Sequence, residues 1–338
     1  MTDLLLGADL WTSTLRGGAA LLFVALGVYL PYRAGALNLG AEGIMLAGCY
    51  GAILVAAKTG GSPWVGVLAG MATGAALAGL LALLALGLRA NLYVIGIALN
   101  FAVSGGTAVL TGILYGTAGT ITTPSLSPLP HVGAHWDQGL PWLGQLLGSQ
   151  TVLVYVAIGA AVATTWWINN WRSGVVLRAT GTRPDVVQAQ GFDVRRTQAI
   201  ALIVGGALIG LGGAQLALSG TAQFTPDMTS GRGFVALTLI FVAGSRCGLL
   251  IPLAFAFAAF DAVGVNLQAL HLPTELSAVV PYAAVIVLLV LVARGQELLR
   301  RRRPAATPTA GGPDEPPQPP QPSLTADLSI SSQEADRL

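Results

Sequence analysis

Isolated polar side chains recur inside apolar stretches of this sequence, and their chemistry could serve a function. Asn100 and Ser104 lie one helical turn apart, and with Thr107 they define one face of a predicted helix. Such groups must face protein or water rather than lipid tails. They could line a polar cavity that offers hydrogen-bond donors and acceptors to a solute, or they could join helices to one another. The later members of this set are Gln215, Asp261, Asn266 and Gln268.

Two acids stand out among these groups. Asp261 is the strongest candidate for a functional role, because an isolated acid is costly to keep inside a membrane. Glu42 follows Asn38 by four residues, which predicts that both lie on one face of a helix. Two interpretations of this pair stay open. Glu42 complements the positive N-terminal end of its own helix while Asn38 caps it or bonds a neighbouring helix, or both line a solute pathway.

Motifs for enzyme chemistry are missing from the sequence. There is no G-x-x-x-x-G-K-[ST] phosphate loop, no H-E-x-x-H zinc motif and no G-x-S-x-G nucleophile elbow. His131 and His135 lie four residues apart, but Gly133 between them and prolines before them argue against a helix that would align them on a metal. We therefore expect no catalytic residue, no metal site, no cofactor bound by this chain and no nucleic-acid partner.

The composition predicts an integral membrane protein. Of 338 residues, 17 are basic and 15 are acidic, so only 9% are charged, against roughly 25% in an ordinary soluble protein. Apolar residues make up 54%, and 44 glycines recur within apolar runs, as in helices that pack closely in lipid. We expect an all-α, polytopic bundle of about nine transmembrane helices. The predicted spans are residues 15–32, 36–57, 64–88, 92–114, 151–171, 198–219, 233–243, 249–270 and 278–293.

The distribution of basic residues predicts the orientation of these spans. With the N-terminus outside and the C-terminus inside, 13 basic residues fall in the cytoplasm and only Arg16, Lys58 and Arg232 lie on or near the other side. The connection over residues 115–150 contains no Lys or Arg, as expected for an exported loop. After a transmembrane domain over residues 1–303, the proline-rich residues 304–338 predict a disordered cytoplasmic tail.

The cytoplasmic connection over residues 172–197 is too long for a simple turn. Thr182 and Asp185 have the spacing of a capping box around Pro184, and Gly191 would end a helix of about eight residues. The apolar side chains of this short helix have no evident core to enter. We predict that the segment docks into a groove of another protein, with a helix lying on the membrane surface as the alternative. These apolar side chains are Val186, Val187 and Ala189, followed by Phe192.

Three segments carry a resemblance: Gly35-Ala36-Leu37-Asn38-Leu39-Gly40-Ala41-Glu42-Gly43, Leu177-Arg178-Ala179-Thr180-Gly181 with Pro184-Asp185, Ala189 and Gly191, and Leu237-Thr238-Leu239-Ile240-Phe241-Val242-Ala243-Gly244. Together they resemble the permease subunits of bacterial ATP-binding cassette (ABC) importers. The resemblance covers most of residues 15–294 and is to the group that includes ribose-type, branched-chain amino acid and nucleoside permeases. The Asn-x-Gly-x-Glu-Gly form at residues 38–43 is most similar to the nucleoside branch, which is linked to basic membrane lipoproteins.

The resemblance implies a translocation subunit of the bacterial inner membrane that moves a small polar solute, with a nucleoside as first candidate, by alternating access. It implies four kinds of partner: two ABC ATPases that use ATP, a second permease, an external substrate-binding lipoprotein, and the lipid bilayer. The binding lipoprotein would dock on loops such as residues 115–150 and 221–230. The alternatives are an ion-coupled secondary transporter and an importer for a sugar or a branched-chain amino acid.

Two sets of residues are expected to carry this function. The expected pathway residues are Asn38, Glu42, Asn100, Ser104, Gln215, Asp261 and Asn266. The residues expected to couple the chain to the ATPases are Arg178, Gly181, Thr182, Pro184, Asp185, Val186, Val187, Ala189 and Gly191.

Overall fold

The computed structural model describes residues 8–116, 119–122, 126–133, 148–220, 222–268 and 294. The chain divides into two units, Met1–Ala293 and Arg294–Leu338, and only Arg294 of the second is among the described residues. The account below therefore concerns the first unit. The ninth predicted span, the tail and most of the predicted exported loop lie outside the described residues.

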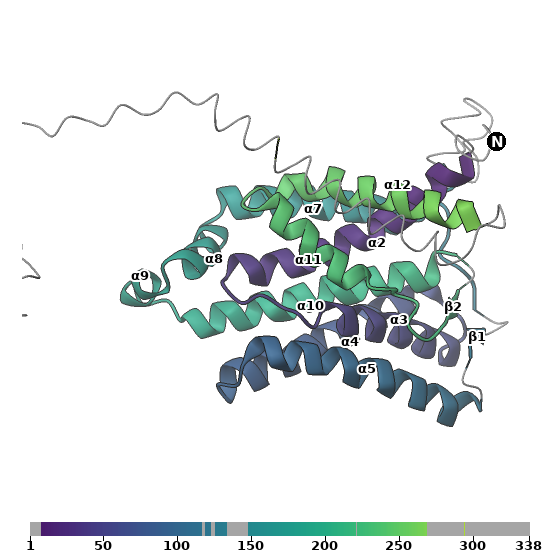
Figure 1. Ribbon diagram of the computed structural model, residues 1–338, viewed down its shortest axis with the longest axis horizontal. Helices are drawn as coiled ribbons and strands as arrows, with labels where there is room; N and C mark the ends of the chain where they lie inside the picture. The colour runs from purple at the N-terminus through teal and green to yellow at the C-terminus, as the bar shows by residue number, and fades with distance from the viewer. Residues whose placement is uncertain are drawn as a thin grey trace, which may run out of the picture. The chain divides into compact units, whose positions relative to one another are not determined.

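The first unit is a bundle of helices that run largely side by side (Figure 1). Seven helices within the described residues are long and apolar enough to cross a membrane, and α11 is a shorter apolar helix. Each of the first eight predicted spans thus coincides with an apolar helix, whereas the count of nine and the orientation stay predictions. The helices are α2 (Ala8–Arg33), α3 (Ala41–Lys58), α4 (Pro63–Ala82) continued by the π-helical turn η1 (Leu83–Gly87), α5 (Leu92–Tyr115), α7 (Val152–Asn170), α8 (Arg172–Thr182), α9 (Pro184–Ala189), α10 (Val194–Leu218), α11 (Arg232–Ala243), the 3-10 turn η3 (Cys247–Leu249) and α12 (Leu250–Gln268).

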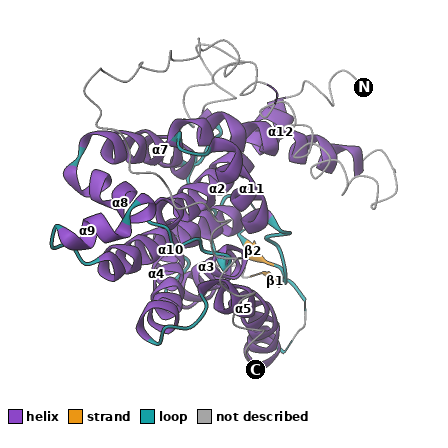
Figure 2. Ribbon diagram, turned by 60° about the vertical axis from the view of Figure 1, so that its left-hand side comes forward, coloured by secondary structure: helices purple, strands orange, loops and turns teal. Residues whose placement is uncertain are grey.

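Helix α10 is the centre of the bundle, in contact with α2, α3 and α4 (Figures 1 and 2). Glycines on α10 allow these backbones to approach closely. A Cβ added at Gly205 would meet the carbonyl oxygen of Gly27 in α2, and one at Gly206 would meet that of Gly74 in α4. Because lipid tails are as apolar as the helices themselves, such close backbone packing is a main source of attraction between membrane helices.

Helix α3 begins at Ala41, five residues later than the sequence predicted. The preceding backbone turns away from helical geometry, with Gly35 at φ +78°. Asn38 also stabilises a non-helical turn before α3, because its side-chain oxygen accepts a hydrogen bond from the Gly40 amide at 2.8 Å. The prediction that Asn38 and Glu42 share one helical face is therefore wrong, since only Glu42 belongs to α3.

Two helices start in the interior of the bundle rather than at its ends (Figure 1). The amide of Gly43, in the first turn of α3, bonds the side chain of Asn100, which lies about 12 Å along α5 from its start at Leu92. The loop before α11 bonds Ser104, about 18 Å along the same helix. At 12 residues, α11 is about 18 Å long and covers roughly 60% of a 30 Å hydrocarbon layer.

A two-residue antiparallel ribbon closes the end of the bundle opposite α8 and α9 (Figure 1). Strand β1 (Ile121–Thr122) pairs with β2 (Gln223–Phe224), and Ile121 lies opposite Phe224. Phe224 is fully buried and packs edge to face on Tyr50 of α3. The ribbon thereby holds the connection from α10 to α11 against the bundle.

Candidate functional site

Six polar side chains converge where α3 and α11 begin, and we call them the polar junction. They come from four helices and from the loop between β2 and α11. Four of them belong to the predicted pathway set, and the other two do not. The members are Glu42, Asn100, Ser104, Asp227, Arg232 and Asp261.

Glu42 caps the N-terminal end of α11. Its two carboxylate oxygens accept hydrogen bonds from the amides of Gly231, at 2.8 Å, and Gly233, at 2.6 Å. These amides have no partner within their own helix, and the carboxylate also complements the positive end of the helix dipole. Glu42 thus serves a different helix from the one that the sequence suggested. Gly233 permits the contact, because a Cβ there would collide with the backbone of Glu42.

Asn100 holds the start of α3 against α5. Its side-chain oxygen accepts from the Gly43 amide at 2.8 Å, and its side-chain nitrogen donates to the Leu39 carbonyl at 2.9 Å. Both the oxygen and the nitrogen of the Asn100 side chain therefore bond backbone groups, at the point where the loop before α3 becomes a helix. This arrangement corresponds to the interhelical role that the sequence left open for Asn100.

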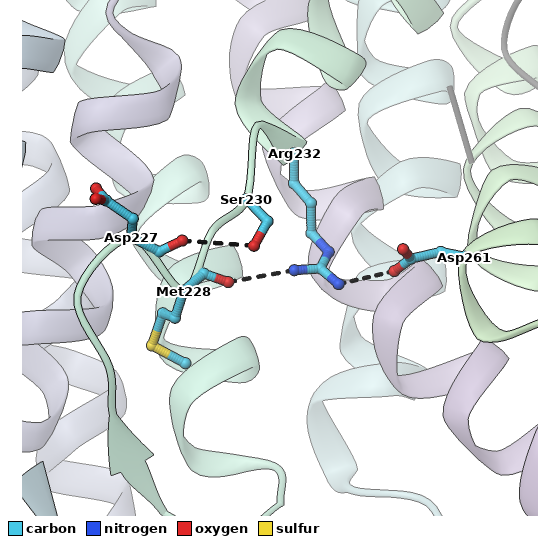
Figure 3. A network of polar contacts seen from close by, with 5 residues as sticks. All are labelled: Asp227, Met228, Ser230, Arg232 and Asp261. Carbon is cyan, nitrogen blue, oxygen red and sulfur yellow. Dashed lines mark hydrogen bonds and ion pairs between the residues drawn. The ribbon is translucent and has the colours of Figure 1, made fainter. Parts of the chain in front are cut away.

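Arg232 and Asp261 form an ion pair between α11 and α12, with 2.7 Å between Nη2 and Oδ2 (Figure 3). Their side chains are 20% and 25% exposed, so the pair is partly shielded from solvent. Arg232 also donates from Nη1 to the Met228 carbonyl at 3.3 Å. Asp261, predicted as a lone acid, is thus neutralised by a residue that the sequence analysis placed at the outer surface.

Asp227 is the member of the polar junction that the sequence analysis did not name. Ser104 donates to its Oδ1 at 2.7 Å, and its carboxylate points away from the Arg232–Asp261 pair (Figure 3). Residues 221–230 were predicted to be a loop on which the binding lipoprotein docks, and no polar role inside the bundle was expected for them. The glycines at 231 and 233 were the available signal, since they indicate a helix that starts tightly packed against another backbone.

Three predicted pathway residues lie away from the polar junction. Asn38 is fully buried, and its side-chain nitrogen has no hydrogen-bond partner within the described part of the chain. Gln215 is buried and donates to the Thr151 hydroxyl at 3.0 Å, which joins α10 to the start of α7. Asn266 is part-exposed near the end of α12. The side chain of Gln268 is outside the described set.

The predicted docking segment is built from two helices, α8 and α9. The proposed capping box is wrong, because Thr182 is the last residue of α8 and its hydroxyl donates back to the Arg178 carbonyl at 3.1 Å. Helix α9 is six residues long, with Pro184 as its first residue as predicted. Gly191 follows its end in the left-handed region, at φ +85°, also as predicted.

The apolar side chains of α9 are divided between an anchor and an exposed surface. Val187 is only 3% exposed and holds the helix in place, so the prediction that these residues lack a core fails for this residue. Val186 and Phe192 are 47% and 48% exposed. Asp185 and Ala189 are exposed as well. The segment therefore presents a small mixed surface at the end of the bundle (Figure 1).

Helix α8 rests directly on the end of α2. A Cβ at Gly181 would collide with the carbonyl oxygen of Arg33, and the amide nitrogen of Gly35 is the next nearest atom. Beside this contact is a cavity of about 340 Å³, lined by Arg33 and Arg178 together with three residues that carry hydroxyl groups. These are Tyr32, Tyr93 and Thr182.

The sequence matches a family described as the permease component of branched-chain amino acid transport systems, over residues 11–290. The chain belongs to this family. It is a multi-pass permease subunit of an ABC importer in the cell membrane, as the resemblance implied. Family members are transport subunits rather than enzymes, and they work with ATPase subunits and a substrate-binding protein.

The relatives of this permease are named for different solutes. It is 32% identical to the putative glucose ABC transporter permease protein TsgC13 of Haloferax volcanii, over 82% of this chain and 83% of that protein. It is 29% identical to the guanosine ABC transporter permease protein NupQ of Bacillus subtilis, over 81% and 89%. It is 27% identical to the nucleoside ABC transporter permease protein NupC of Lactococcus lactis, over 79% and 87%. No solved structure matches this permease.

Proposed function

We propose that this permease moves a hydroxyl-bearing solute without net negative charge, with a nucleoside as first candidate and a sugar as second. The complex would contain two ABC ATPases, a second permease subunit of the same or a different kind, and an external substrate-binding lipoprotein. ATP would be bound by the ATPases and not by this chain. Family membership removes the ion-coupled secondary transporter as an alternative.

The observation that carries the choice of solute is the excess of negative charge at the polar junction. The polar junction contains three acids, Glu42, Asp227 and Asp261, and one base, Arg232, so its formal charges sum to −2. Such a site disfavours a solute with a net negative charge, because charge repulsion is strong in a low-dielectric interior. Glucose and guanosine, named for two relatives, are rich in hydroxyls and carry no carboxylate.

A contiguous set of contacts supports a mechanism of alternating access. ATPase closure would push on α9 and α8, and α8 rests on Arg33 and Gly35 through Gly181. Residues 34–40 lead from there into α3, whose Glu42 holds the first turn of α11. Displacement of the docking segment would therefore reach both helices that start inside the bundle. ATP must drive the cycle, because a solute shifts an equilibrium only by its differential affinity for the two states.

The test is to identify the solute retained by the co-purified binding protein and then to measure its uptake by the reconstituted complex. Mass spectrometry of the binding protein should find a nucleoside or a sugar, and proteoliposomes should accumulate it only when ATP is supplied to the ATPases. A retained branched-chain amino acid would refute the proposed solute. Uptake that continues without ATP and stops when an ion gradient is collapsed would refute the mechanism.

A further inference from the structure

Asp227 is an exposed carboxylate at the middle depth of the bundle. Its partner Ser104 lies near the midpoint of α5, a helix of 24 residues that is about 36 Å long. No basic side chain of the described residues lies within ion-pair distance of Asp227, because the one ion pair found among them joins Arg232 to Asp261. An acid in this position cannot face lipid tails. It must therefore face a water-filled pathway or another polar surface.

The backbone around Asp227 is held in an unusual conformation. Asp227 and Ser230 both have left-handed backbones, at φ +54° and +47°. Successive turns fix this shape, since the Ser230 amide donates to the Asp227 carbonyl and the Arg232 amide donates to the Thr229 carbonyl, both at 3.0 Å. Backbone strain of this kind persists where the surrounding structure enforces it, and it is concentrated at binding sites.

The neighbours of Asp227 on α5 supply the rest of a binding surface. Ser104 donates its hydroxyl hydrogen to Asp227, so its oxygen lone pairs remain able to accept from a solute. Phe101 precedes Ser104 by three residues on the same helix, which places the two side chains next to each other, and Phe101 is 76% exposed. An acceptor pair beside an exposed aromatic ring suits a sugar, whose hydroxyls donate while its C–H face packs on the ring.

We infer that Asp227, Ser104 and Phe101 form a solute subsite that binds neighbouring hydroxyl groups. This inference rests on the proposed function and deepens it, because it assigns the recognition of the sugar part to this permease and not only to the binding protein. The other carboxylate oxygen of Asp227 accepts a hydrogen bond from one hydroxyl group, the Ser104 oxygen accepts one from the next, and Phe101 covers the apolar face of the ring. Glu42 is assigned to the cap of α11 rather than to this subsite, since each of its oxygens accepts a hydrogen bond from an amide of α11.

The experiment compares uptake of hydroxylated and deoxygenated probes by the complete importer in proteoliposomes. The probes are guanosine with 2′,3′-dideoxyguanosine, and D-glucose with its dideoxy analogue. Wild type should prefer the hydroxylated probe, and Asp227→Asn and Ser104→Ala should each lower that preference by about tenfold, as expected when a site built for hydroxyls loses its acceptors. Because every variant uses the same binding protein, its own discrimination cancels from the comparison.

Two controls separate recognition from folding. Asp193→Asn makes the same chemical change at the cap of α10, where asparagine caps a helix equally well, and it should leave the preference unchanged. Phe101→Leu should weaken uptake of both probes, whereas Phe260→Leu, at an exposed position on α12, should not. Melting temperatures of the variants should stay near that of wild type.

The outcomes distinguish this inference from the proposed function. If wild type takes up guanosine or glucose with ATP while Asp227→Asn keeps the full preference for hydroxyls, the subsite is refuted and the proposed function stands. If uptake depends on sodium and Asp227→Asn removes that dependence, the carboxylate binds a cation and the inference fails. If the transported solute bears no hydroxyl groups, both ideas fail together.

Discussion

Glu42 shows how one side chain can set the position of a whole helix. Each of its carboxylate oxygens accepts a hydrogen bond from an amide of α11, and we therefore assign Glu42 as a structural cap rather than a solute ligand. We predict that Glu42→Gln destabilises the permease by roughly 1.5–3 kcal/mol, because one amide of α11 loses a charged hydrogen-bond partner. The measurement is thermal unfolding of the purified permease together with ATP-driven uptake, both of which should fall.

The same variant decides between the two roles that the sequence left open for this residue. A cap predicts lower stability with unchanged preference among solutes. A pathway residue predicts altered preference with unchanged stability, and that result would show our assignment of Glu42 to be mistaken. Asp193→Asn is again the matched control, because its cap survives the substitution.

The ion pair between Arg232 and Asp261 gives a second prediction at the scale of residues. Asp261→Asn leaves the guanidinium of Arg232 partly buried without a counter-charge, which costs more than removing both charges. We therefore expect the double variant Arg232→Gln, Asp261→Asn to be more stable than Asp261→Asn alone. A double-mutant cycle on unfolding measures this coupling, and additive effects of the two substitutions would contradict it.

The sequence identified four of the six polar junction residues but none of their partners. Polar groups inside apolar helices are conspicuous in a sequence, since each must find a partner away from lipid. The partner of Glu42, however, lies 189 residues away, and no local pattern specifies which helix end will meet it. Asp227 was missed for a related reason, because a loop that folds back into the bundle has the same composition as an exported one.

At the scale of elements, the contact between α8 and α2 transmits motion from the docking segment. Gly181 allows it, since any side chain there would collide with the Arg33 carbonyl. We predict that Gly181→Ala lets the ATPases continue to hydrolyse ATP while uptake falls, so that ATP consumed per solute rises roughly fivefold or more. Gly159→Ala on α7 is the matched control, because a Cβ there meets no described atom within 4 Å. If both variants consume the same amount of ATP per transported solute, this contact does not transmit the motion of the docking segment.

Helix positions were predicted well where the length of an apolar stretch determines them. They were predicted poorly where a turn before the helix determines its first residue. Helix α5 begins at Leu92 as predicted, with Asn91 accepting from the Tyr93 amide at 2.9 Å. The start of α3 and the cap of α9 were both misjudged, because Asn38 and Thr182 bond their own local backbone and do not cap the following helix. A short polar side chain near a helix start has both options, and tertiary contacts select between them.

At the scale of the whole molecule, the orientation in the membrane decides whether α9 can meet an ATPase at all. Thr59 and Ala90 are exposed in the connections just before α4 and just after η1, so they mark opposite ends of one crossing. The basic residues place Ala90 in the cytoplasm and Thr59 outside. We predict that a membrane-impermeant maleimide labels Thr59→Cys in intact cells and labels Ala90→Cys only after permeabilisation. Background should be low, because both native cysteines, Cys49 and Cys247, are buried. The reverse pattern would place α9 outside the cell, beyond the reach of any ATPase, and would leave the proposed coupling route without a driving subunit.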